Sequence, residues 1–183
     1  MCLDFHIHSV GYRYQHEPGF LIDRPSGSGD YLFLHFLSNI EIKTEGQIIS
    51  VPSDSCILYG PDFPQWYTSS YNPFINSFFH FRGMNVAHYM DQFHIPINQV
   101  FYPRNPSFIE IQIQSLEKEV LLKDTLWEYS VAGILMQFFV RLGRSCSGKN
   151  TGYTNPSKLE LLEKFRTARI QILQHPEYPW TLE

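Results

Sequence analysis

The sequence predicts a mainly β domain that is followed by helices. In residues 1–105, short runs of Phe, Tyr, Ile and Leu alternate with turn residues at intervals of roughly ten positions, as in a β-sandwich or small barrel. After Pro106 the apolar residues adopt the three-and-four spacing of amphipathic helices. A chain of 183 residues is also long enough to bury a substantial core without disulfides or structural metals.

The expected strands follow one another with a turn between neighbours. RPSGSGD, residues 24–30, forms the most pronounced loop, because Gly, Ser and Pro favour turns. IEIKTEGQIISV predicts a hairpin that turns at Glu45-Gly46. In chain order, the expected strands are residues 5–10, 11–16, 20–23, 31–37, the two arms of 40–51, then 56–59, 65–68 and 74–81.

Two capping-box patterns mark the starts of a helical pair in residues 106–144. The first is SFIE, residues 107–110, which precedes an apolar stripe. The second is TLWE, residues 125–128, and its helix is expected to end at Gly143 as a C-cap. Helices joined by so short a connection should pack antiparallel. The stripe of the first helix consists of Ile109, Ile113, Leu116 and Val120.

The last part of the sequence has a different organisation. Residues 145–156 contain almost no apolar side chains and are expected to form a linker. Residues 157–175 carry an amphipathic helical pattern, which needs a further surface to pack against. The apolar stripe of this expected helix consists of Leu161, Leu162, Phe165, Ala168, Ile172 and Leu173.

The composition favours an intracellular protein that does not bind nucleic acid through these residues. The net charge is −4, whereas phosphate backbones attract basic surfaces. The three cysteines (Cys2, Cys56 and Cys146) form no Cys-x-x-Cys pair, which predicts reduced thiols and a cytoplasmic location. The start, MCLDFHIHSV, lacks the features of a signal peptide, and no stretch is apolar enough to span a membrane, so no membrane association is expected.

Candidate ligand-binding side chains lie at the ends and inner faces of the expected strands. Arg24 ends a strand beside the RPSGSGD loop, and its guanidinium suits hydroxyls or carboxylates. A surface ion pair with Asp23 or Asp30 is an equal alternative. Trp66 and Tyr67 point to opposite faces of their strand, so one of them should face the interior.

The last long strand, FINSFFHF, has two contrasting faces. Asn76, Phe78 and His80 share a mixed polar and aromatic face, which is typical of a ligand-site lining. The opposite face is apolar and includes Phe79 and Phe81, as expected of core. For His80, a hydrogen-bonded core position is an alternative to ligand contact.

The sequence gives little support for catalysis. His6 and His8 share one strand face, but no third metal ligand stands at a telling spacing. His35 has no partner histidine two residues away, and Gln65 occupies the position after a proline loop where a metal-ligating histidine would be expected. No nucleophile motif or phosphate-binding loop occurs. We therefore expect no metal, no cofactor and no enzyme activity.

Three stretches are similar to those of a known family. These are LIDRPSGSGDYLFLHFL, VPSDSCILYGPDFPQWYTSS and, most distinctively, NSFFHFRG. The chain resembles the AraC-type transcriptional regulators. The resemblance covers most of the chain and implies a cupin-like double-stranded β-helix, or jelly-roll barrel, followed by an antiparallel pair of dimerisation helices. In this family a C-terminal domain with two helix-turn-helix motifs binds DNA.

The resemblance also implies a ligand site. The sugar-contacting positions of the arabinose-responsive member correspond here to Arg24, Gln65, Tyr67, Asn76 and Phe78. Only Arg24 and Tyr67 match in residue type, so a sugar or related small polar metabolite, instead of arabinose itself, is the expected effector. Arginine, amide and phenol groups bind hydroxyls, and aromatic faces stack on sugar rings.

The end of the sequence, RIQILQHPEYPWTLE, resembles the start of the family's DNA-binding domain. Residues 157–183 would then be the first helix and the beginning of the second helix of a truncated domain. The resemblance implies a homodimeric, ligand-sensing regulator that contacts DNA only through the missing part. Two alternatives stay open: a cupin-type isomerase or oxygenase, and a stand-alone carbohydrate-binding module.

Overall fold

A computed structural model describes residues 5–44 and 46–146, together with residues 165, 168 and 172. The chain divides into two compact units, residues 1–147 and 148–183. The expected linker and the helix over residues 157–175 fall almost entirely outside the described residues. Within that helix only residues 165, 168 and 172 are described, and they are helical.

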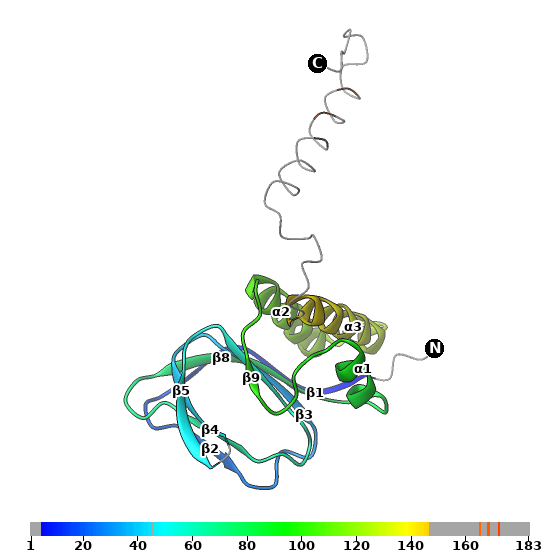
Figure 1. Ribbon diagram of the computed structural model, residues 1–183. Helices are drawn as coiled ribbons and strands as arrows, with labels where there is room; N and C mark the ends of the chain where they lie inside the picture. Colours follow the sequence, from blue (N-terminus) through cyan, green and yellow to red (C-terminus); the bar gives the residue numbers. More distant parts are fainter. Residues whose placement is uncertain (1–4, 45, 147–164, 166–167, 169–171, 173–183) are drawn as a thin grey trace. The chain divides into compact units, whose positions relative to one another are not determined.

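The first unit is built mainly from antiparallel strands. Two sheets have the strand orders β1-β8-β3-β6-β9 and β2-β7-β4-β5. They curve around a common interior to form a barrel (Figure 1). The expected mainly β, cupin-like fold with C-terminal helices is confirmed. The strands are β1 (His6–His16), β2 (Leu21–Arg24), β3 (Tyr31–Phe36), β4 (Ile40–Thr44), β5 (Gln47–Val51), β6 (Ser55–Tyr59), β7 (Gln65–Thr68), β8 (Phe74–Arg82) and β9 (Val100–Phe101).

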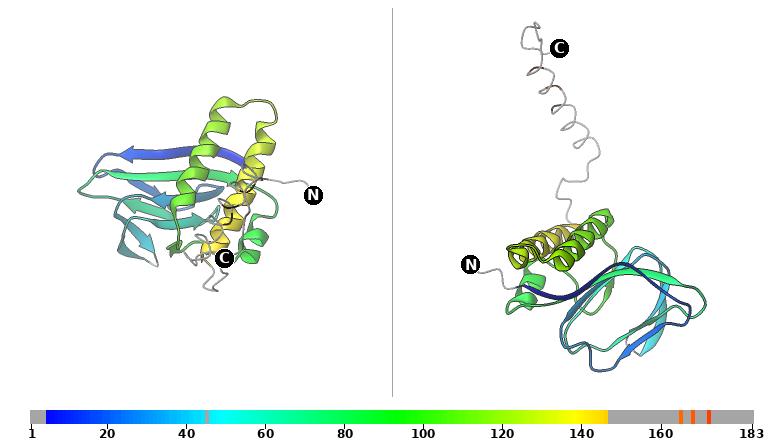
Figure 2. Two further views of the ribbon diagram at one scale, coloured as in Figure 1. Left: turned by 90° about the horizontal axis from the view of Figure 1, so that it is seen from above. Right: turned by 180° about the vertical axis from the view of Figure 1, so that it is seen from behind.

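Three helices accompany the barrel: α1 (Val86–Gln92), α2 (Ser107–Leu122) and α3 (Trp127–Cys146). The helices α2 and α3 lie side by side and cover one face of the barrel, next to β1 and β8 (Figures 1 and 2). The expected antiparallel helical pair is therefore present. The short helix α1 lies within residues 1–105, where the sequence pattern predicted only strands, so that expectation was wrong for residues 86–92.

Strand alternation gives the barrel wall two buried faces. On β3, Leu32, Leu34 and Phe36 face the barrel interior, whereas Phe33 faces the helices. The interior cluster consists of Leu32, Leu34, Phe36, Ile40, Ile42, Val51, Ile57, Tyr59, Tyr67 and Phe74. The second cluster joins Phe33, Phe79 and Phe81 to helix residues that include Phe108, Ile113, Leu135, Phe138 and Phe139.

Neither predicted capping box forms in the structure. The N-cap residue of α2 is Pro106, without a side-chain hydrogen bond, and Ser107 Oγ donates to Asn105 Oδ1 at 2.8 Å. The side chain of Glu110 turns instead toward the barrel, where His35 and Ser77 bind it. The buried hydrogen bonds of the Glu110 carboxylate stabilise it more than a capping interaction at the helix surface would.

The start and end of α3 also differ from prediction. The helix begins at Trp127, after Leu126 in a left-handed conformation (φ 65°), and not at a capping Thr125. It continues past Gly143 to Cys146, so Gly143 is not a C-cap. A Cβ atom at Gly143 would clash with the backbone carbonyl oxygen of Phe93, and glycine at this position lets α3 approach the segment after α1.

Strand β1 is a single bulged strand, although two shorter strands were predicted. Its register with β8 shifts between Ile7 and Ser9 and again between Gly11 and Tyr14. Arg13 lies in the second bulge with a φ of 52°. Bulges redirect side chains and bend a strand, and here Arg13 points toward α2.

Candidate functional site

The six residues singled out by sequence lie on the inward-facing positions of three strands. In the β2–β7 pair, Arg24 is opposite Gln65 and Ile22 is opposite Tyr67. In the β3–β8 pair, Leu34 is opposite Phe78, and the neighbouring inward positions of β8 are Asn76 and His80. Both pairs follow from the period-two alternation of strands. The shared inward face of Asn76, Phe78 and His80 was thus predicted correctly, and Tyr67, not Trp66, is the buried member of its pair.

A chain of hydrogen bonds crosses one mouth of the barrel. Arg24 Nη1 donates to Gln65 Oε1 at 3.2 Å, and Gln65 Nε2 donates to Ser28 Oγ at 2.9 Å. Ser28 Oγ donates in turn to the carbonyl oxygen of Asp30 at 3.1 Å. The chain connects one sheet to the other across the RPSGSGD loop. Arg24 pairs with Gln65 and not with Asp23 or Asp30, so the surface ion pair considered as an alternative is not formed.

Asp30 is the centre of this mouth, which we call the Asp30 mouth. Its Oδ1 accepts a hydrogen bond from His80 Nδ1 at 2.8 Å, and its Oδ2 accepts one from His8 Nδ1 at 3.0 Å. Burial by itself would raise the pKa of Asp30, but the hydrogen bonds from His8, His80 and Ser28 outweigh burial and lower it. The carboxylate is therefore held ionised with both oxygens occupied.

The opposite end of the barrel holds a second polar group within an aromatic setting. His16 Nε2 donates to Asn76 Oδ1 at 3.0 Å. The imidazole is stacked between Phe20 and Phe74, with ring centroids 4.2 and 4.6 Å away. Burial lowers the pKa of His16 and the bond to Asn76 only partly opposes this, so the neutral ring is favoured.

The middle of the barrel is apolar and closely filled. The ring of Tyr67 packs edge-on against Phe36 at 5.5 Å, and burial raises its pKa to about 12. Tyr59 is almost fully buried, and its hydroxyl has no hydrogen-bond partner among the residues that the structure describes. An unsatisfied buried hydroxyl is costly, which makes Tyr59 a polar group that a ligand could satisfy.

The predicted site residues therefore do not form one cluster. Arg24, Gln65 and His80 gather at the Asp30 mouth, Asn76 lies at the other end with His16, and Tyr67 and Phe78 lie between them. Gln65 and Asn76 are each 1% exposed and Tyr67 is 5% exposed. A ligand can reach these three side chains only if the barrel interior opens.

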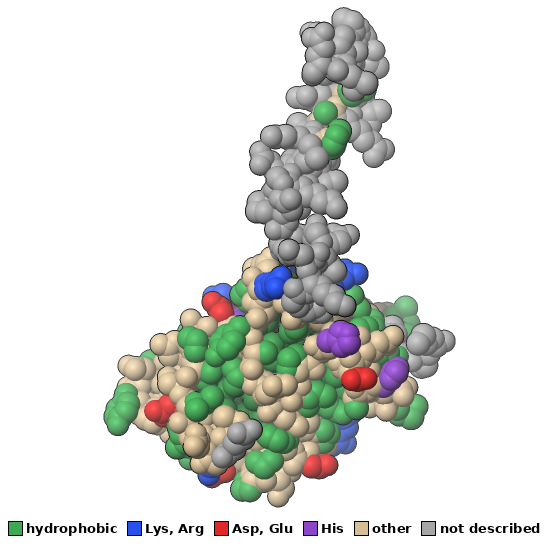
Figure 3. All heavy atoms as spheres, in the orientation of Figure 1, with side chains coloured by type: hydrophobic (Ala, Val, Ile, Leu, Met, Phe, Trp, Pro, Cys, Tyr) green, Lys and Arg blue, Asp and Glu red, His purple; other side chains and the backbone are tan. Residues whose placement is uncertain are grey.

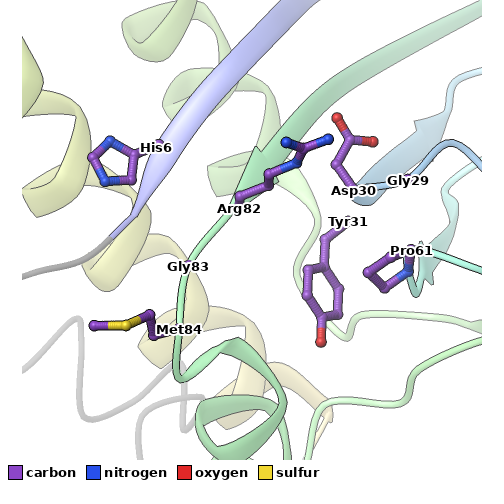
Figure 4. A pocket seen from close by; sticks show the side chains of 8 residues that line it. All are labelled: His6, Gly29, Asp30, Tyr31, Pro61, Arg82, Gly83 and Met84. Atoms are coloured by element: carbon purple, nitrogen blue, oxygen red, sulfur yellow. The ribbon is translucent and has the colours of Figure 1, made fainter.

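A surface cavity of about 380 Å³ adjoins the Asp30 mouth. Figure 4 shows Arg82 and Asp30 in its wall, with the Tyr31 ring and Pro61 near them and His6 and Met84 on the other side. The residues that line the cavity are His6, Gly29, Asp30, Tyr31, Pro61, Arg82, Gly83 and Met84.

Sequence reasoning missed several members of these polar groups. Ser28 was read only as a loop residue and Asp30 only as a possible partner of Arg24. His8 was considered for metal binding alone, and His16 was not considered. The mixed face of β8 was the available signal, because buried polar side chains such as Asn76 and His80 require partners.

The described residues contain no group of three or more His, Cys, Asp or Glu side chains arranged to hold a metal ion. His8 and His80 come nearest, but both direct Nδ1 at Asp30. No helix within the described ranges is long and apolar enough to cross a membrane.

Comparisons with known proteins give structural likenesses without a family assignment. No known protein family and no curated protein matches the sequence. A cupin_2 domain of an XRE-family transcriptional regulator from Enterobacter cloacae is similar over 36% of this chain and 74% of its own length, with 24% identity and a TM-score of 0.30. ToxT from Vibrio cholerae is similar over 97% of this chain and 68% of its own, with 10% identity and a TM-score of 0.45.

An iron enzyme is also among the similar structures. HEPD from Streptomyces albus, with 2-hydroxyethylphosphonate and Fe(II) bound, is similar over 81% of this chain and 41% of its own, with 14% identity and a TM-score of 0.27.

Proposed function

We propose that this chain is the ligand-sensing and dimerisation part of a cytoplasmic transcription regulator of the AraC type. The observation that carries the proposal is the polar content of an otherwise apolar barrel. Arg24, Gln65, Asn76 and His80 all face inward, although leaving such groups in an apolar interior is costly. A barrel that served only as a scaffold would be more stable with apolar residues at these positions.

The proposed effector is a small polar metabolite of the carbohydrate class. Arg24 and Gln65 offer donors and acceptors suited to hydroxyls, and they already form an ordered pair at 3.2 Å. The aromatic rings of Tyr67 and Phe78 lie between the two polar ends and provide surfaces that stack on sugar rings. The ligand would replace the hydrogen bonds that Gln65 makes in the closed interior. It would also give the Tyr59 hydroxyl a hydrogen-bond partner.

A buried polar network offers a route from the barrel to the helices. Glu110 of α2 accepts hydrogen bonds from His35 Nδ1 at 2.8 Å, from Ser77 Oγ at 3.1 Å and from Arg13 Nε at 3.2 Å. These three partners belong to β3, β8 and β1. We call this group the Glu110 network. Since Ser77 and Asn76 are adjacent on β8, a ligand that shifts this strand would also shift the support of α2.

The proposed dimer surface is the outer face of α2. The resemblance implies dimer contacts through the helical pair, but Val131, Leu135 and Phe139 of α3 are buried against the barrel and α2. Ile111, Leu121 and Leu122 are instead exposed by 61%, 75% and 65%. Ile111 and Leu122 lie on nearly the same side of α2, and exposed apolar side chains on one surface are typical of a protein–protein contact.

We assign DNA binding neither to the barrel nor to the helices α1 to α3. On the face shown in Figure 3, basic side chains are scattered and form no continuous patch. A surface of this kind has little attraction for phosphate backbones. A helix-turn-helix domain after residue 157 would supply that contact.

Two other functions compete with this proposal. A cupin enzyme would require a metal centre, for which the described residues contain no group of three ligating side chains, and a stand-alone carbohydrate-binding module would require no dimer. Metal analysis of protein purified without chelators distinguishes the first, since stoichiometric iron, manganese or zinc would favour the enzyme. Sedimentation analysis distinguishes the second, since a monomer at all concentrations would favour the module.

The test of the effector site is a thermal-shift screen of sugars and sugar acids. We expect a stabilising ligand whose effect is lost in Arg24→Ala and in Tyr67→Phe, because both side chains face the interior. Arg144→Ala and Tyr129→Phe, both on exposed positions of α3, are the matched controls and should retain the effect. A stabilising sugar that is unaffected by both interior variants would refute the site.

A further inference from the structure

The cavity beside the Asp30 mouth has a cationic side chain without a partner. Arg82 ends β8, where its register partner on β1 is His6, and its side chain is exposed. Within the described residues, the Arg82 guanidinium takes part in no hydrogen bond or ion pair, although it lines the cavity with Asp30 (Figure 4). A guanidinium offers planar paired donors that fit a carboxylate or a phosphate.

Asp30 does not cancel the attraction of this cavity for an anion. Its two carboxylate oxygens are already bound by His80 at 2.8 Å and His8 at 3.0 Å. Only about a tenth of the side chain, 9%, is exposed. Both carboxylate oxygens of Asp30 are thus held within the His8–Asp30–His80 group, whereas Arg82 and His6 are the exposed polar side chains of the cavity wall.

The rest of the wall is apolar and preformed. One face of the Tyr31 ring is stacked on Phe81 at a centroid distance of 5.5 Å, so the half-buried ring is held in place while its remaining surface lines the cavity. Met84 is 86% exposed at the rim. The loop that carries the floor is tied by a hydrogen bond from the Gly29 amide to the Pro61 carbonyl oxygen at 2.9 Å.

The approach of this loop to residues 61–62 depends on glycine. Gly27 has a φ of +74°, which side chains rarely adopt, and a Cβ atom there would clash with the carbonyl oxygen of Pro61. Glycine at this position therefore lets the loop that carries the cavity floor lie close to residues 61–62.

We propose that this cavity binds a small anion, a carboxylate or phosphate carried on a flat apolar body, with Arg82 holding the anionic group and Tyr31, Pro61 and Met84 contacting the body. The volume of about 380 Å³ suits a ligand of one or two rings. This site lies outside the barrel interior, so it is distinct from the proposed sugar site. A negative result for one of the two sites would not decide the other.

The test uses ¹⁵N-labelled protein and three probes: benzoate, phenyl phosphate and the neutral benzyl alcohol. We expect one or both anions to shift the amide signals of Gly29 and Gly83, which line the cavity, and benzyl alcohol to leave them unchanged. The two anions distinguish a carboxylate site from a phosphate site. Arg82→Gln should weaken the binding of the anion by about tenfold, the effect of losing a hydrogen bond between charged groups.

A control variant separates this site from a general effect of charge. Arg144→Gln, at an exposed position of α3, should leave the anion affinity unchanged. Arg82 is exposed at a strand end, so Arg82→Gln should keep the fold, which circular dichroism and the melting temperature check. The proposal is overturned if neither anion shifts these two amides, if Arg82→Gln binds as well as the parent, or if benzyl alcohol produces the same shifts.

Discussion

The inner and outer faces of the sheet β1-β8-β3-β6-β9 are both buried, but they differ in how they include polar groups. Inside the barrel, polar side chains lie at the two ends, at Gln65 and at Asn76, and the middle is apolar. Under the helices, the face is a continuous aromatic core with one ionic group, the Glu110 network. Strand β8 contributes alternate residues to both faces.

This difference indicates that the two faces have separate roles. The outer face joins the barrel to α2 and α3 through rings such as Phe79, which lies within 5.2 Å of the ring centroids of both Phe33 and Phe138. The inner face has less to gain from rigidity, because its polar groups would have to exchange partners when a ligand enters. We therefore expect substitutions on the outer face to affect stability most.

The largest effect is expected for Phe79→Ala. Phe79 is fully buried between β3 and α3, so truncation removes apolar contact and leaves a cavity. We expect a loss of roughly 3–5 kcal/mol in the free energy of unfolding, measured by urea titration. Phe78→Ala, one residue away on the partly buried inner face, is the matched control and should cost clearly less. Equal losses would show that the two faces do not differ in this way.

The next largest effect is expected for Glu110→Gln. The substitution removes the charge that His35, which is 1% exposed, binds at 2.8 Å. Breaking a buried pair by changing one partner should cost roughly 3 kcal/mol of unfolding free energy. Glu119→Gln, on the same helix but without a side-chain hydrogen bond among the described residues, should cost little. If both variants lost little unfolding free energy, the Glu110 network would not contribute substantially to stability.

The same network predicts a response to acid. Burial by itself would raise the pKa of Glu110, but the bonds from His35, Ser77 and Arg13 lower it below the ordinary value of 4.5. A folded-state pKa below the unfolded value stabilises the protein above pH 4.5, and this contribution is lost as the pH falls through the folded pKa.

The acid response is measured as unfolding free energy against pH. The difference between the parent and Glu110→Gln should be fully present near neutral pH and should shrink below pH 4.5. Asp30, whose pKa is also lowered, is unchanged in both proteins, so its contribution cancels in the difference. A difference that grows as the pH falls would contradict the assignment.

The smallest effect on stability is expected for Leu122→Glu. Leu122 is 65% exposed at the end of α2, so the unfolding free energy should change by less than about 0.5 kcal/mol. If α2 forms the proposed dimer, however, sedimentation should show a shift from dimer to monomer. Lys118→Glu, on the same helix, tests whether charge alone has this effect. A parent protein that is already monomeric would rule out the α2 dimer.

Much of the fold was predictable because it depends on local patterns. Alternation identified the inward face of β8, and turn residues located most strands and the hairpin near Gly46. Helix α1 was missed because it is short, lacks a capping side chain, and buries only Val86 and Met90. The helical pair was predicted, but its capping boxes were not formed.

The candidate site was predictable only in part. The strands of Arg24, Gln65 and Asn76 were identified, and so was the face that Asn76 shares with Phe78 and His80. The separation of these residues into two ends of the barrel was not, because alternation defines a face and not a position along the barrel axis.

The sequence by itself determined the class of fold, the two faces of the last long strand and the polar side chains that these faces carry, since these follow from short-range periodicity. Only the tertiary structure decided which of them meet. Asp30 contacts His8 and His80, which are 22 and 50 residues away, and Glu110 contacts His35 at a separation of 75 residues. Sheet order and register bring these groups together, and buried charges then take the partners that the fold places beside them.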